Sequence, residues 1–220
     1  MLHPNRTRLD EEFMAGVTFT IGASLHQDYG GENFIHEILG KISIRNVDNE
    51  TEEAAGELRA SLVQFGEAQA HGISSRVLGD GFSLEISRYW QELFDLDGHE
   101  FKVEIQNGWQ TEGTDLLIIS SVQIPPKYEA SGIGLATLGR TIALFSRSCD
   151  LVACLPKGME DYSQSEGNFS QPKAPNTSGK LAKTIARLQD DCLKAGFRAF
   201  GETGIYLLNP THKRPDVQLE

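Results

Sequence analysis

The chain has 220 residues, of which 39% are hydrophobic and 23% are charged, as in an ordinary globular protein that can bury a full core. Its 20 basic and 31 acidic residues give a formal charge of -11, which argues against a protein that binds nucleic acid or anionic membranes, because both need a basic face. The amino-terminal residues lack the apolar core of a signal peptide, and no run approaches the roughly 18 apolar residues of a membrane span, so we expect a soluble cytoplasmic protein.

The first part of the chain mixes strand-like and helix-like patterns. Residues 1–14 are polar and predict a lead-in without regular structure. The alternation in Val17–Ile21 and the spacing of the apolar residues in Phe34–Val47 predict two strands. From Thr51 to Ala68, apolar residues recur at helical spacing behind an acidic first turn, which predicts a helix.

The next segment, residues 72–98, contains several glycines. Three of them in Gly72–Phe82 predict a loop, and the apolar residues of Leu84–Leu96 predict a short helix that Gly98 ends. Phe101–Ile105 alternates between apolar and polar residues, which predicts a strand.

Two nearly continuous apolar segments follow. Residues 115–124 and 151–155 predict central strands covered on both faces, with a helix over 133–147 between them. Residues 157–179 are rich in Ser, Gly, Asn, Gln and Pro and predict a long loop or insertion.

The chain closes with an amphipathic helix and a hairpin. Apolar residues from Leu181 to Leu193 fall on one stripe, and Gly196 is a natural helix end. Residues 197–208 predict a hairpin, and residues 210–220 predict a tail. The composition shifts only at the long loop, so we expect one mixed α/β domain over 15–209.

The most informative segment is the glycine turn that follows the strand at 115–124. Pro125-Pro126 stops this strand, and a polar turn leads to Gly132-Ile133-Gly134 at the start of the next helix. The first N–H groups of a helix lack internal partners and are suited to binding a phosphate. A tight turn that only packs the helix on the strand explains the same glycines. The pattern is neither a dinucleotide fingerprint nor a nucleotide P-loop, since no third glycine and no Gly-Lys-Ser/Thr follows.

The motif and the order of elements around it resemble the GNAT superfamily of acyl-CoA-dependent N-acyltransferases. The family motif runs Val/Ile-x-Pro-x-Tyr-Arg/Gln-x-x-Gly-Ile/Leu-Gly, and here it reads Ile124-Pro125-Pro126-Lys127-Tyr128-Glu129-Ala130-Ser131-Gly132-Ile133-Gly134. The family's closing helix ends in Gly-Phe, as in Ala195-Gly196-Phe197. The resemblance extends over 115–208.

The resemblance implies an α+β fold: a central, mostly antiparallel twisted sheet with helices on both faces. It implies acetyl-CoA as co-substrate and an amine of a small molecule or a protein as acceptor, and it leaves a homodimer open. The pantetheine arm of acetyl-CoA would pair with backbone near Val122 and Ile124 in a gap beside the strand at 115–124. The backbone N–H groups that would hold its pyrophosphate belong to Ala130, Ser131, Gly132, Ile133, Gly134 and Leu135.

The family mechanism is direct attack of an unprotonated amine on the thioester, aided by a base and by a proton donor to the leaving thiolate. Glu104 is the candidate base, and Ser120 and Ser121 are candidates for ordering a water. Cys192 stands where the family usually has a tyrosine donor, and Glu129 replaces its Arg/Gln. Packing of Cys192 on the apolar stripe and an exposed Glu104 are the structural alternatives.

Two other functions stay open. Glu129 and Cys192 are also compatible with a catalytically weak or inactive GNAT-fold module that binds acyl-CoA, and a glycine turn that only packs would suit an adaptor protein. The six histidines lack ligand spacing, and the three cysteines (Cys149, Cys154 and Cys192) have the pattern of free thiols, so we expect no metal. The acidic balance favours a cationic acceptor such as a polyamine, an aminoglycoside or a lysine side chain.

Overall fold

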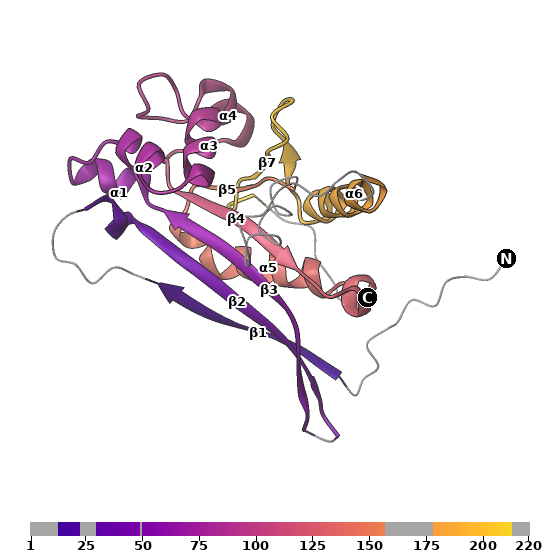
Figure 1. Ribbon diagram of the computed structural model, residues 1–220. Helices are drawn as coiled ribbons and strands as arrows, with labels where there is room; N and C mark the ends of the chain where they lie inside the picture. Colours follow the sequence, from indigo (N-terminus) through magenta and orange to yellow (C-terminus); the bar gives the residue numbers. More distant parts are fainter. Residues whose placement is uncertain (1–12, 23–29, 49, 157–177, 213–220) are drawn as a thin grey trace, which may run out of the picture.

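The computed structural model describes residues 13–22, 30–48, 50–156 and 178–212 (Figure 1). Within these residues the chain forms a seven-stranded sheet of order β1-β2-β3-β4-β5-β7-β6. All neighbours are antiparallel except β4 and β5, which are parallel. The strands are β1 (Phe13–Gly22), β2 (Ile35–Asn46), β3 (Glu52–Val63), β4 (Leu116–Gln123), β5 (Leu151–Cys154), β6 (Arg198–Ala199) and β7 (Tyr206–Leu208).

The same residues contain six α-helices and three short 3-10 helices. The α-helices are α1 (Phe65–Ala70), α2 (Ser75–Gly81), α3 (Leu84–Leu93), α4 (Val103–Trp109), α5 (Ile133–Phe145) and α6 (Ser178–Lys194). The 3-10 helices are η1 (Gly31–Phe34), η2 (Pro126–Ser131) and η3 (Ser146–Ser148). No helix of these ranges has both the length and the apolarity needed to cross a bilayer.

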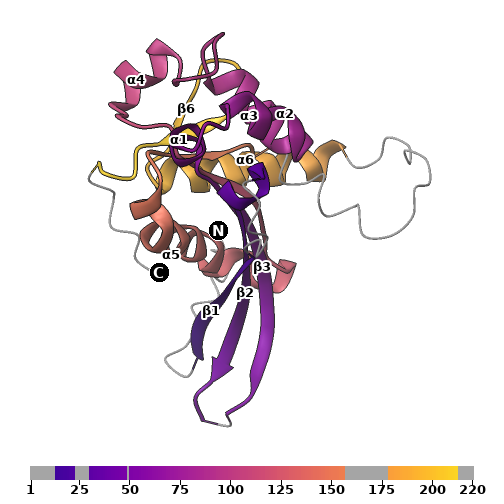
Figure 2. The ribbon, with the colours of Figure 1, turned by 90° about the vertical axis from the view of Figure 1, so that its left-hand side faces the viewer.

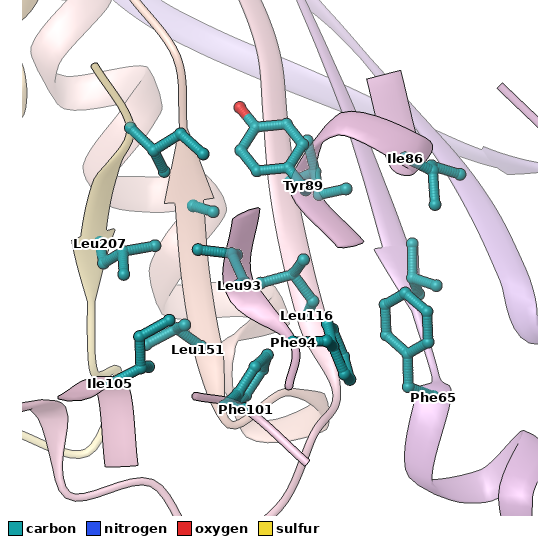
Figure 3. Packing of buried hydrophobic residues seen from close by; sticks show 14 of the residues in the cluster. Phe65, Ile86, Tyr89, Leu93, Phe94, Phe101, Ile105, Leu116, Leu151 and Leu207 are labelled. Carbon is teal, nitrogen blue, oxygen red and sulfur yellow. The ribbon is translucent and has the colours of Figure 1, made fainter. Parts of the chain in front are cut away.

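Helices cover both faces of the sheet, as predicted. Along β4, Leu116 and Ile118 join the cluster formed with α1 to α4, and Figure 3 shows part of this packing. Leu117 and Ile119 face the other way and pack against α5 and α6. All four side chains are fully buried, and each contributes about 1.5–3 kcal/mol to the free energy of folding. This two-sided burial explains why β4 is apolar nearly throughout.

The long strands β1 to β3 extend beyond helices α1 to α4, as Figure 2 shows. A third apolar cluster lies along this extension, where Ile42, Ile44 and Ala55 pack with Ile133 at the start of α5. Tyr128 of η2 packs against the same cluster. The glycine turn is therefore seated on β2 and β3 as well as on its own strand.

The helix predicted between Thr51 and Ala68 is wrong: most of this segment is β3, and only Phe65–Ala70 is helical. β3 pairs with β2 on one side and β4 on the other, and Leu58, Ala60 and Leu62 are buried with a period of two. Alanine, glutamate and leucine favour helix locally, but pairing on both edges of the strand outweighs that preference.

The loop predicted over Gly72–Phe82 is also wrong, because Ser75–Gly81 forms α2. Its glycine at position 79 permits close helix packing: a Cβ there would lie 2.5 Å from Cγ of Trp90 on α3. Glycine thus marks a helix contact here and not a chain reversal.

The strand predicted over Phe101–Ile105 is replaced by α4. Phe101, Ile105 and Trp109 are buried at helical spacing, while Val103 and Glu104 are exposed. A five-residue window cannot separate a period of two from the beginning of a period near four.

The other predicted strands and helices are confirmed to within a few residues: β1, β2, α3, β4, α5, β5, α6 and the closing β6–β7 hairpin. Most of the predicted lead-in, long loop and tail (residues 1–12, 157–177 and 213–220) lies outside the described residues. Phe13 and Met14, assigned to the lead-in, already belong to β1.

Candidate functional site

The sheet opens between β4 and β5. These two strands pair only from Leu116↔Leu151 to Ile119↔Cys154, and β5 stops there, two residues before Pro156. β4 continues to Gln123 and stays paired with β3. Among the described residues, the edge of Ser120–Gln123 that faces away from β3 therefore has no strand partner. We call this gap the β4–β5 opening.

A β-bulge lies at the point where the opening begins. Ala60 pairs with Ile119 and Arg59 pairs with Ser121, so Ser120 is the extra residue of β4. A bulge bends its strand and redirects a side chain, and bulges are frequent beside active sites. The Ser120 hydroxyl donates a hydrogen bond to Oε2 of Glu85 on α3 over 2.9 Å.

An apolar cleft lies in the opening on the side of α5 and α6. Its volume of about 20 Å³ holds about one water molecule, and its lining residues are Val122, Ile124, Gly134, Leu138, Arg187, Leu188, Asp191 and Cys192. Four of these, Val122, Ile124, Gly134 and Cys192, were predicted as site residues. The structure brings them together. A larger ligand would need these lining side chains to move.

The glycine turn places the first turn of α5 beside this cleft, because Gly134 is one of its lining residues. Gly132 has a φ of 77°, a conformation that favours glycine. The Ala136 N–H donates to the Gly132 carbonyl over 3.0 Å as the helix begins, and Ser131 Oγ accepts the Ile133 N–H at 3.4 Å. By helix geometry, the N–H groups of Gly134 and Leu135 precede any i to i−4 partner within α5.

The rest of the predicted phosphate-binding set lies in η2 or at its end. Ala130 and Ser131 are its last two residues, and the Ser131 hydroxyl donates to the Tyr128 carbonyl over 2.6 Å. Glu53 of β3 ties the turn to the sheet, because its carboxylate accepts hydrogen bonds from Lys127 Nζ and, at 2.6 Å, from the Tyr128 hydroxyl. These two bonds lower the pKa of Glu53.

Glu129 does not carry an uncompensated charge at the turn. Its Oε2 lies 2.6 Å from Nη1 of Arg187, which extends from α6 and lines the cleft. Asp191 lines the same cleft one turn further along α6; burial raises the pKa of Asp191, and Arg187 and Lys194 oppose that rise. Arg187 thus supplies positive charge beside the motif, although the motif itself has an acid there.

Two thiols lie next to the cleft. Sγ of Cys154, at the end of β5, is 3.2 Å from Sγ of Cys192, and both residues are buried. Burial raises the pKa of the Cys154 thiol, and the contact with Cys192 acts in the same direction. Cys192, the candidate proton donor, lines the cleft and also packs in the apolar cluster with α5, which was the structural alternative.

A second, larger cavity lies on the opposite face of the sheet. It is bounded by β1–β3 and by residues 82–86, which precede and begin α3. Its volume is about 790 Å³, and we call it the α3 cavity. Arg59 and Ser120 of the bulge line it from the sheet, and Glu85 lines it from α3. Ser83 caps α3 by accepting the Ile86 N–H at 3.1 Å, which places Glu85 in the first helical turn.

Tyr89 follows Glu85 by one turn of α3. The residue is 1% exposed, and its hydroxyl has no hydrogen-bond partner among the described residues. Figure 3 shows this hydroxyl directed away from the aromatic residues Phe94 and Phe101 of the cluster. Burial raises the pKa of Tyr89, and the nearby Cys154 thiol and Glu85 carboxylate raise it further.

Glu104, the candidate base, lies in the first turn of α4, is exposed, and lines neither the cleft nor the α3 cavity. Ser121 is buried in β4 beside the bulge. Glu85 and Tyr89 were not among the predicted site residues. Their i, i+4 spacing on an amphipathic helix was the available signal, and it indicates a shared face without saying what that face meets.

No protein-family model matches the chain, and no curated protein and no solved structure matches it. Within the described ranges, no group of three or more His, Cys, Asp or Glu residues is arranged to hold a metal ion. Function is therefore inferred from the residues around the β4–β5 opening.

Proposed function

We propose that this protein is a GNAT-like N-acyltransferase that moves an acetyl group from acetyl-CoA to an amine. The observation that carries the proposal is the β4–β5 opening: β4 loses β5 at Ile119 but continues alongside β3 to Gln123, directly before the glycine turn. The free strand edge can pair with the amides of a pantetheine arm, and the start of α5 can accept a pyrophosphate.

The residues of the opening divide the work of binding. Val122 and Ile124 offer backbone groups and apolar side chains to the pantetheine arm, and Gly134 leaves room beside them. Arg187 would exchange its bond to Glu129 for one to the pyrophosphate. The backbone N–H groups of 130–135 complete the anion site.

Transfer then requires two proton movements. The amine nitrogen attacks the thioester carbon, the C–S bond breaks, the nitrogen loses a proton, and the leaving thiolate gains one. Two groups near the opening can donate to the thiolate: the Cys192 thiol, which stands at the family's usual tyrosine position, and the Tyr89 hydroxyl. Cys192 lines the cleft directly, whereas the Tyr89 hydroxyl has no hydrogen-bond partner among the described residues and is free to donate.

Thermal unfolding with acetyl-CoA tests the binding half of the proposal. Ligand at a hundred times its Kd adds about 2.7 kcal/mol to the free energy of unfolding, which raises the melting temperature by several degrees. Release of free thiol over a panel of amines tests transfer. An unchanged melting temperature at millimolar acetyl-CoA would contradict the proposal.

A second candidate is an acyl-CoA-binding module without transferase activity. The tight packing of Cys192 against Cys154 favours it, since that thiol already has a buried neighbour. If the protein is such a module, we expect the same thermal shift with acetyl-CoA but no release of free thiol with any amine.

A further inference from the structure

The α3 cavity and the apolar cleft meet the same short stretch of β4 from opposite faces of the sheet. Ser120 lines the cavity, and Val122, two residues along the strand, lines the cleft. Tyr89 is a second link, because its hydroxyl is close enough to interact electrostatically with Glu85 of the cavity and with Cys192 of the cleft. The cavity and the cleft therefore lie against nearby residues of β4 at the β4–β5 opening, on opposite faces of the sheet.

The described lining of the cavity is acidic. Glu32, Glu37 and Glu85 contribute three carboxylates, and Arg59 contributes one guanidinium. Its volume of about 790 Å³ lies within the usual range for small-molecule sites. A cavity with this charge concentrates cations and disfavours anions.

Among the carboxylates that line the cavity, Glu85 is the one hydrogen-bonded to the bulge residue at the β4–β5 opening. Its Oε2 accepts the Ser120 hydroxyl at 2.9 Å, and Ser120 is the bulge residue where β5 leaves β4. The first turn of a helix suits an ionised carboxylate, because the positive end of the helix dipole lies there. A carboxylate can accept several hydrogen bonds at once, so the bond from Ser120 is compatible with a role as proton acceptor.

We propose that the α3 cavity is the acceptor site, that it selects an amine carrying a second positive charge, and that Glu85 removes the proton from the attacking nitrogen. This inference rests on the proposed acyltransferase function and adds a substrate class and a catalytic residue to it. The nitrogen becomes positively charged as it attacks the thioester, and its proton passes to the Glu85 carboxylate. The C–S bond breaks, and the thiolate takes up a proton from the donor, Tyr89 or Cys192, so the products are an amide and a free thiol.

The first test measures binding without turnover. Spermidine is titrated calorimetrically into the wild-type protein and into Glu37→Gln, Glu85→Gln and Glu92→Gln. Glu92 is also on α3 but does not line the cavity, so Glu92→Gln is the matched control. We expect the first two variants to weaken spermidine about tenfold and the control to bind within twofold of wild type. Absence of spermidine binding, with acetyl-CoA binding intact, would overturn the acceptor assignment alone.

The second test measures turnover. We expect spermidine to have a kcat/KM at least tenfold above tyramine and far above glutamate, whose own carboxylates the cavity repels. Glu85→Gln should lower kcat about a hundredfold, leave the acetyl-CoA Kd within twofold, and remove the acidic limb of the pH–rate profile. An unchanged kcat and profile in Glu85→Gln, or binding of both ligands without thiol release in the wild type, would overturn the role of Glu85. Failure of acetyl-CoA binding would instead overturn the proposed function.

Discussion

Arg187 of α6 and Glu129 of η2 form an ion pair, with 2.6 Å between Nη1 and Oε2. Their side chains are 34% and 40% exposed, so the pair adds at most about 1 kcal/mol to stability. Its place is more informative than its strength. The pair joins η2 to α6, and Arg187 lines the cleft together with Gly134 of the first turn of α5.

The ion pair predicts opposite effects for its two partners. Arg187→Gln should weaken acetyl-CoA binding about tenfold, because a charge-assisted contact to phosphate is lost. Glu129→Gln should tighten it about threefold, because Arg187 no longer has to leave a carboxylate. Both Kd values are measured calorimetrically at low and high salt, with Lys194→Gln, on the last turn of α6, as control. Equal affinities in the two variants would contradict the exchange of partners.

Gly134 lines the cleft, so a larger side chain at this position should block acetyl-CoA sterically. A Cβ at this position would lie 3.3 Å from Cγ1 of Ile124, and a valine would extend into the cleft. Gly134→Val should reduce acetyl-CoA affinity more than tenfold. Gly139→Val is the matched control, because it makes the same change on α5 where a Cβ meets no atom within 4 Å. Its affinity should stay within twofold of wild type, and a similar loss in both variants would show that helix perturbation, not blocking, is the cause.

Tyr89 and Cys192 can be separated as proton donors by comparing stability with turnover. Tyr89→Phe removes a buried hydroxyl without a described partner, so the free energy of unfolding should stay equal or rise by about 1 kcal/mol. Turnover should fall about a hundredfold if Tyr89 is the donor. Cys192→Ala should cost about 1–2 kcal/mol through lost packing and leave turnover within threefold. Urea unfolding and steady-state kinetics measure both, and the reverse pattern would identify Cys192 as the donor.

The glycine turn was predictable because its signals are local. A strand ended by Pro125-Pro126, a polar turn and two glycines before a helix are all read within twenty residues, and the structure places them as expected. β3 was not predictable in this way, because Leu58 and Leu62 fit a helix until β2 and β4 pair with the segment.

The α3 side of the site could not be found from spacing either. Glu85 meets Ser120 across 35 residues of sequence, through a bulge that exists only because Arg59 and Ala60 pair on either side of it. The partner of Glu129 was hidden for a similar reason: Arg187 reaches the turn from α6, more than fifty residues later.

Because of Asp115, which lies just before β4, we expect the free energy of unfolding to depend on pH. Its Oδ1 accepts the Gly66 N–H at 2.8 Å, and its own N–H donates to Asp150 Oδ2 at 2.9 Å. Burial raises the pKa of Asp115, the bond from Gly66 opposes the rise, and the charge of Asp150 adds to it. A carboxyl whose pKa is higher in the folded state stabilises the fold most when protonated. That contribution is complete below the ordinary value of 3.8 and is lost as pH rises through the raised value.

Asp115→Asn keeps an acceptor for the Gly66 N–H but cannot ionise. The free energy of unfolding of this variant, minus that of wild type, should therefore increase as pH rises from 3.8 through the raised pKa and level off above it. The increase should be at most about 1 kcal/mol, because the carboxyl is partly in contact with water. Urea unfolding at a series of pH values measures it, and Asp97→Asn, in an exposed turn, controls for the loss of one negative charge. A difference that stays flat, or one that falls with pH, would mean that the bond from Gly66 outweighs burial at this carboxyl.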